Sequence, residues 1–345
     1  MGVQFGMMRK RSLASCCLLS FLFVQGALPR PAAQEDPMHL RVNVVLVQLN
    51  VAVTDNKGEY VTGLRPEDFS VTEDKIPQKV STFEENSEGQ SESDDVIRPG
   101  HVANSKAAVD VATGDSSAVS VSHVSDASVF VLFDTSNYMY RSFVYAQDAI
   151  TDFIRSMDGA SKIAFYSYCR DLSRAIELTP DHFSIINGVR STVAGDDAAL
   201  YNSLLLTVKD AAPLKGRKAI VVFSNGPDNA SSVPPEDVAE LAQSTGTIIY
   251  IISTRQAEDD PASAAAFERM SKVSGGKAYF AKSWREEKQA FASIRKDLVH
   301  LYTLSYYPQT NPNRGWRSIK VRLVGKDLQK YHIRTRDGYR LVAQR

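Results

Sequence analysis

Hydrophobic and polar positions follow two alternating patterns between residues 127 and 300. Short apolar runs such as FVLF (130–133), AIVVF (219–223) and IIYII (248–252) are typical of strands buried on both faces. The segments between such runs carry apolar residues at helical spacing and predict helices at residues 143–157, 182–189, 200–211, 235–244, 262–273 and 284–300. Strands that alternate with helices indicate a parallel sheet covered on both sides. We therefore predict a doubly wound, Rossmann-like α/β domain at residues 127–300.

The sequence has a β pattern on both sides of this domain. In the segment 38–84, Leu49, Val51 and Val53 fall on one face of a strand, and a return strand is expected from Tyr60. The tail at 301–345 contains further alternating, strand-like stretches. We predict that this N-terminal β unit and the C-terminal tail pack together as one sandwich-like unit.

Residues 85–126 have a different composition. This segment is rich in Ser, Asp, Gly and Ala and contains no aromatic residue. Such a composition cannot bury enough apolar surface to offset the entropy of ordering the chain. It predicts a flexible linker or a long excursion.

The N-terminus resembles a targeting segment. A basic stretch at 9–11 precedes an apolar stretch at 13–28 that is short for a membrane span. We predict a signal peptide at residues 1–33, cleaved after Ala33 in preference to Ala27, with an uncleaved anchor as the alternative. The protein is then exported to the periplasm, the cell surface or the medium, and no stable membrane span remains after cleavage.

The net charge bears on the choice of partner, and the cysteine content bears on whether disulfides stabilise the fold. The chain has 40 Lys+Arg and 40 Asp+Glu, so no net charge favours a nucleic-acid partner. Of the three cysteines, only Cys169 follows the predicted cleavage site. The mature protein should therefore contain no internal disulfide, and its core must be stable without one.

Polar residues gather where the predicted strands end. Asp134 and Ser136 follow the first strand, Asp197 precedes a helix, and Asn225 and Asp228 follow the AIVVF strand. Because the carboxyl ends of parallel strands meet at one edge of the sheet, these side chains should lie close together. Oxygen-bearing side chains in such a place are candidate ligands for a hard divalent cation.

Three stretches together suggest a family. DTSNY (134–138), AALYNSL (198–204) and VVFSNGPDNAS (221–231) resemble the loops of the von Willebrand factor type A domain. The flanking β segments also resemble type-A-related proteins that are abundant in acidobacteria. The resemblance covers nearly the whole mature chain. It implies a Rossmann-like fold and a metal ion-dependent adhesion site with the pattern DxSxS, a threonine before a helix and an aspartate after a central strand.

Only part of the metal-binding pattern implied by this resemblance is present. Asp134 and Ser136 match its first two positions. Tyr138 stands in place of the second serine, Ala198 in place of the threonine, and Asn225 in place of the second aspartate. Because Mg²⁺ prefers six oxygens and usually one or two carboxylates, we predict a degenerate site and no resident cofactor.

Weak binding of Mg²⁺ or Mn²⁺ remains the alternative, with Asp197 and Asn225 as further donors. Motifs of hydrolases, metalloproteases and dinucleotide-binding enzymes are absent from the sequence. We therefore predict a non-enzymatic, adhesion-type protein that binds protein partners at a rim formed by Asp134, Ser136, Tyr138, Asp197, Asn225 and Asp228. Two alternatives stay open: a metal-dependent adhesin that uses Asp134 and Ser136, and a metal-assisted hydrolase that uses Asp134, Asp197 and Asp228.

Overall fold

The computed structural model describes residues 46–85, 127–157, 161–254 and 260–341. The signal peptide predicted at residues 1–33, with its cleavage at Ala33 or Ala27, lies outside these ranges. The linker predicted at residues 85–126 also lies outside them, apart from its first residue.

A six-stranded sheet forms the centre of the α/β domain, with the strand order β10-β9-β8-β5-β6-β7. Neighbouring strands are parallel except for the edge strand β7, which runs antiparallel to β6. The strands are β5 (Ala127–Asp134), β6 (Lys162–Tyr168), β7 (Leu172–Thr179), β8 (Arg217–Ser224), β9 (Thr247–Thr254) and β10 (Ala278–Ala281). This arrangement confirms the predicted doubly wound, Rossmann-like fold.

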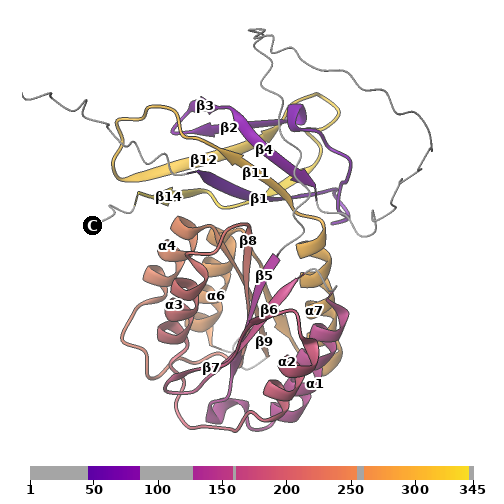
Figure 1. Cartoon of the computed structure of the whole chain (residues 1–345), viewed down its shortest axis with the longest axis vertical. Coiled ribbons are helices and arrows are strands. Elements are labelled where there is room, and N and C mark those ends of the chain that lie inside the picture. Colours follow the sequence, from indigo (N-terminus) through magenta and orange to yellow (C-terminus); the bar gives the residue numbers. More distant parts are fainter. Residues whose placement is uncertain (1–45, 86–126, 158–160, 255–259, 342–345) are drawn as a thin grey trace, which may run out of the picture. The chain divides into compact units, whose positions relative to one another are not determined.

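Helices cover both faces of the sheet (Figure 1). They are α1 (Phe143–Ser156), α2 (His182–Arg190), α3 (Leu200–Ala211), α4 (Pro235–Thr245), α6 (Pro261–Ser274) and α7 (Trp284–Val299). Successive side chains of β5 point to opposite faces. Val131 and Phe133 enter a core with α1, α2 and α7, whereas Phe130 and Leu132 enter a core with α3, α4 and α6. Burial on both faces explains why the central strands are continuous apolar runs.

The helix ends follow from local sequence. The carboxylate of Asp181 accepts hydrogen bonds from two backbone N–H groups at the start of α2. Gly246 and Gly275 end α4 and α6 in the left-handed region, with φ of 69° and 90°. The Ser283 side chain caps α7 by accepting a hydrogen bond from the Glu286 N–H, and the Glu286 carboxylate accepts one from the Lys282 N–H.

Two four-stranded antiparallel sheets build the flanking β region, in the orders β13-β1-β11-β4 and β14-β12-β2-β3. Each sheet combines strands that precede the α/β domain with strands that follow it; Val51 pairs with Tyr302, and Val71 pairs with Val321. Their bounds are β1 (Val47–Thr54), β2 (Phe69–Glu73), β3 (Ile76–Gln78), β4 (Val80–Glu85), β11 (Tyr302–Tyr306), β12 (Trp316–Leu323), β13 (His332–Arg334) and β14 (Gly338–Arg340). Apolar residues of both sheets share one core, as in a β-sandwich.

The strand predicted to begin at Tyr60 does not form. Tyr60 makes one isolated bridge with Thr54, and the chain then leaves the sheet towards the short 3-10 helix η1 (Pro66–Asp68). The neighbours of β1 are instead β11 and β13, which come from the far end of the chain. Local alternation alone therefore gave the wrong partner for β1.

A buried carboxylate on α7 connects elements from four parts of the chain. Asp297 accepts hydrogen bonds from the hydroxyl groups of Tyr60 at 2.7 Å and Tyr250 at 2.6 Å. It also pairs with Arg334 of β13 at 2.5 Å, and its side chain is 1 % exposed. The α/β domain and the β-sandwich are therefore joined by a charge-assisted network as well as by the covalent chain.

None of the helices in the described parts of the chain is both long and apolar enough to cross a membrane.

Candidate functional site

Three loops meet at the carboxyl ends of β5 and β8. The first follows β5 and contains the 3-10 helix η2 (Asn137–Met139), the second precedes α3, and the third follows β8. The Asn137 backbone N–H donates to the carbonyl of Asp196 at 2.8 Å, which joins the first two loops. The Asn229 side chain accepts from the Ala198 N–H at 2.8 Å, which joins the second and third. The structure thus places the predicted strand-end residues in one region.

Asp134 is the last residue of β5 and is fully buried. Its Oδ1 accepts a hydrogen bond from the Ser136 N–H at 2.9 Å, and its Oδ2 accepts one from the Ser224 hydroxyl at 2.8 Å. Burial raises the pKa of Asp134, because desolvation disfavours the ionised form, although these hydrogen bonds oppose that effect. The carboxylate is thus held by protein groups on both of its oxygens.

Two residues of this network were not among the predicted site residues. The Tyr168 hydroxyl at the end of β6 donates to Ser224 Oγ at 3.0 Å, and Ser224 in turn donates to Asp134. Burial, and next the nearby Asp134 carboxylate, raise the pKa of Tyr168 well above its ordinary value, so the phenol remains protonated. Their positions at the ends of the neighbouring strands β6 and β8 are the signal that could have identified them.

Asp228 and Asp197 have other structural roles. Asp228 accepts hydrogen bonds from the Tyr201 N–H at the start of α3 and from the Ser231 N–H, both at 2.8 Å. Asp197 is half exposed and pairs with Arg170 at 3.1 Å. Among the residues that the structure describes, no group of three or more His, Cys, Asp or Glu side chains could hold a metal ion.

The three substituted positions carry groups that differ from the family's pattern. The Ala198 side chain is buried and offers no oxygen, and Tyr138 is half-buried. The Asn225 side chain donates from Nδ2 to the backbone carbonyl of Tyr138, which ties the third loop to the first. Two buried oxygens, Ser136 Oγ and Asn225 Oδ1, make no hydrogen bond with the described residues.

Exposed apolar side chains lie close to this region along the chain. Tyr140, Val144 and Tyr145 lie at and just before the start of α1 and are 64 %, 62 % and 63 % exposed. Val193, in the loop before α3, is 79 % exposed. Aromatic side chains such as Tyr140 and Tyr145 are of the type that is enriched at protein–protein interfaces.

The doubly wound sheet and its helices place this domain in the Rossmann-like α/β class. Within that class the family is more specific. The family model of the von Willebrand factor type A domain matches residues 128–293. This part of the chain is therefore a von Willebrand factor type A domain.

Several solved structures are similar to the chain. BatB from Bacteroides thetaiotaomicron is 16 % identical, with a TM-score of 0.42, over 50 % of this chain and 98 % of that one. The vWF domain of the type V pili tip protein Mfa5 from Porphyromonas gingivalis is 12 % identical, with a TM-score of 0.41, over 49 % and 94 %. Proximal thread matrix protein 1 from the mussel byssus, with a zinc-occupied MIDAS motif, is 11 % identical, with a TM-score of 0.43, over 54 % and 48 %. A search of curated protein sequences finds no match.

Proposed function

We propose that this chain is an exported, non-enzymatic protein-interaction module whose metal ion-dependent adhesion site has lost its ion. Its partner binds at the rim formed by the predicted site residues and the exposed side chains beside it. Protein interaction is the usual role of type A domains, and the family match at residues 128–293 supports it here. Export rests on the basic and apolar pattern at the N-terminus.

The position of Asn225 is the single observation that carries the proposal. This residue stands where the family's second aspartate would be, and its amide nitrogen is a hydrogen-bond donor to the Tyr138 carbonyl. A donor and a neutral amide at this place replace a carboxylate that would attract a cation. Asp134 is then the single carboxylate of the pattern, and both of its oxygens already accept hydrogen bonds. This set of groups is a poor fit to Mg²⁺.

Calorimetry with Mg²⁺ and Mn²⁺ tests the loss of the ion. We expect no binding heat at millimolar metal. The triple variant Tyr138→Ser, Ala198→Thr, Asn225→Asp rebuilds the family's pattern, so it should bind Mg²⁺, and its melting temperature should rise with added Mg²⁺. Heat in the natural protein that disappears in Asp134→Ala would refute the proposal, and the triple variant proves that the assay detects binding.

A pull-down from the native envelope fraction tests the interaction surface. The variant Tyr140→Ser, Val144→Ser should lose a partner that the natural protein retains with and without chelator. Phe183→Ser removes an apolar side chain on α2 that is 73 % exposed. This control variant should still retain the partner. Retention by all three proteins would place the partner elsewhere.

A second function is favoured by one observation. Ser136 Oγ and Asn225 Oδ1 are buried oxygens without hydrogen-bond partners among the described residues, and such atoms are satisfied by a cation as well as by water. A metal-dependent adhesin would use them together with Asp134. Partner retention that chelator abolishes would identify this second function.

A further inference from the structure

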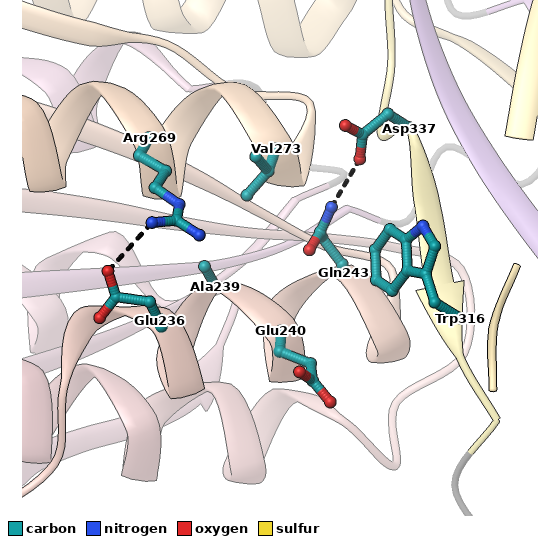
Figure 2. Close-up of a pocket in the computed structure, with 8 residues that line it drawn as sticks. All are labelled: Glu236, Ala239, Glu240, Gln243, Arg269, Val273, Trp316 and Asp337. Carbon is teal, nitrogen blue, oxygen red and sulfur yellow. Dashed lines mark hydrogen bonds and ion pairs between the residues drawn. The ribbon is translucent and has the colours of Figure 1, made fainter. Parts of the chain in front are cut away.

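A cavity outside the strand-end loops lies between α4, α6 and the start of β12. Its volume is about 280 Å³. Figure 2 shows eight of its lining residues; Ala239 and Val273 provide aliphatic surface and Trp316 provides an aromatic wall. No lining residue belongs to the site described above. A cavity of this size suits one side chain of a partner better than a large ligand.

Trp316 is fixed in its position. A Cβ atom on Gly338 would lie 2.4 Å from Trp316 Cζ2, so the indole ring packs directly on the backbone of β14. The Asn313 side chain donates to the Trp316 carbonyl at 2.6 Å and holds the backbone of this residue. A fixed aromatic wall binds a partner at a low cost in side-chain entropy.

Gln243 presents a hydrogen-bond acceptor to the cavity. The residue is 6 % exposed, and its Nε2 donates to Asp337 Oδ1 at 2.7 Å. This hydrogen bond orients the amide, so Oε1 points away from Asp337 towards the side of Ala239 and Arg269 (Figure 2). The amide nitrogen is thus used by Asp337, whereas the oxygen faces the cavity that Gln243 lines. An acceptor that faces a cavity favours a ligand that brings N–H groups.

The charges of the lining favour a cation. Glu236, Glu240 and Asp337 are negative and Arg269 is positive, which leaves a formal charge of −2. Arg269 pairs with Glu236 at 3.1 Å, and Arg340 pairs with Glu240 at 2.5 Å. With Arg340 counted, these two pairs leave a formal charge of −1 on the Asp337 carboxylate, which accepts a hydrogen bond from Gln243 Nε2 and forms no ion pair with the described residues.

We propose that this cavity binds a basic side chain, a lysine or arginine, of a protein partner. The alkyl stem lies along Ala239, Val273 and the Trp316 ring, as long basic side chains do on apolar surfaces. The charged head donates to Gln243 Oε1 and to Asp337, and the indole face adds a cation–π contact. The site is separate from the strand-end rim and does not depend on the function proposed for it.

Tryptophan fluorescence can test this directly, because the chain has only two tryptophans. Trp284 is 52 % exposed on α7, so the variant Trp284→Phe should fold and leave Trp316 as the only reporter. We expect the peptide acetyl-Gly-Lys-Gly-amide to change its emission saturably, with a Kd of about 1–10 mM. The same peptide with an acetylated lysine has lost its charge and should bind at least about tenfold more weakly.

Variants locate the site. Asp337→Asn keeps an acceptor for Gln243 but removes the charge. It should raise the Kd of the lysine peptide by about fivefold or more. Asp327→Asn makes the same change at an exposed position of the sandwich and should have no effect. The proposal is overturned if the emission does not saturate up to about 50 mM peptide. It is equally overturned if the acetylated peptide binds as well as the lysine peptide, or if the two variants behave alike. The comparison of the two peptides needs no variant at the site, so it remains decisive even if Asp337→Asn fails to fold.

Discussion

The network around Asp297 allows a quantitative prediction about how the two parts of the protein stabilise each other. Asp297 is 1 % exposed, and it receives three donors: two tyrosine hydroxyls and the Arg334 guanidinium. In Asp297→Ala the two hydroxyl groups lose this acceptor, and Arg334 keeps only the Gly275 carbonyl. Breaking a buried ion pair on one side costs about 3–5 kcal/mol, because the remaining charge is left uncompensated. Arg334 keeps 29 % exposure, so part of its charge can be hydrated and we expect a loss of about 3 kcal/mol.

Urea denaturation followed by circular dichroism measures this loss as a change in the free energy of unfolding. Asp152→Ala provides a matched control. Asp152 of α1 pairs at 2.6 Å with Lys288 of α7, the helix that carries Asp297, but this pair lies on the surface, with side chains 47 % and 46 % exposed. An exposed pair of this kind contributes about 1 kcal/mol or less. Asp297→Asn should lose less than Asp297→Ala, since its amide oxygen still accepts from a tyrosine.

The two tryptophans add a spatial test of the same idea. Trp284 lies on α7 of the α/β domain and Trp316 on β12 of the sandwich, so single-tryptophan variants report on each part separately. Without further change, the urea unfolding curves of the two single-tryptophan variants should have the same midpoint. When Asp297→Ala is added to each, the two midpoints should differ, because one connection between the α/β domain and the sandwich is lost. A loss for Asp297→Ala no greater than that of the Asp152 control would refute the reasoning.

Other positions give shorter predictions. Burial lowers the pKa of Lys218 from 10.5 to about 8, so the unfolded chain binds more protons above pH 8. The free energy of unfolding should therefore rise between about pH 8 and 9.5, by at most about 1.4 kcal/mol per pH unit, and Lys218→Met should abolish that rise in urea titrations. A Cβ on Gly276 would lie 1.9 Å from the Ile249 carbonyl oxygen, so Gly276→Ala should lower the free energy of unfolding by about 1–3 kcal/mol, whereas Gly315→Ala, with its nearest atom at 3.5 Å, should be tolerated. Ser283→Ala removes the cap of α7 and should cost about 1 kcal/mol; an unchanged melting curve would contradict its capping role.

The sequence by itself determined the fold class of the α/β domain. Runs such as FVLF and AIVVF must be buried on both faces, and only a sheet covered by helices on both sides provides such burial. The periodicity of the helices and their end signals, such as Asp181 and Gly275, act over a few residues and could be read directly. The loops at the strand ends could also be identified, because the ends of the strands and helices that flank them are set by local sequence.

Only the tertiary structure decided which distant groups meet. The pairing of β1 with β11 joins Val51 to Tyr302, and no local pattern specifies a partner 251 residues away. In the strand-end site, the sequence identified Asp134, but the orientation of the Asn225 amide depends on where the Tyr138 carbonyl lies in the folded chain. Hydrogen bonds are directional over about 3 Å, whereas sequence patterns fix only which face a residue occupies. The geometry of the site, and the cavity beside Trp316, therefore follow from packing between segments that the sequence keeps far apart.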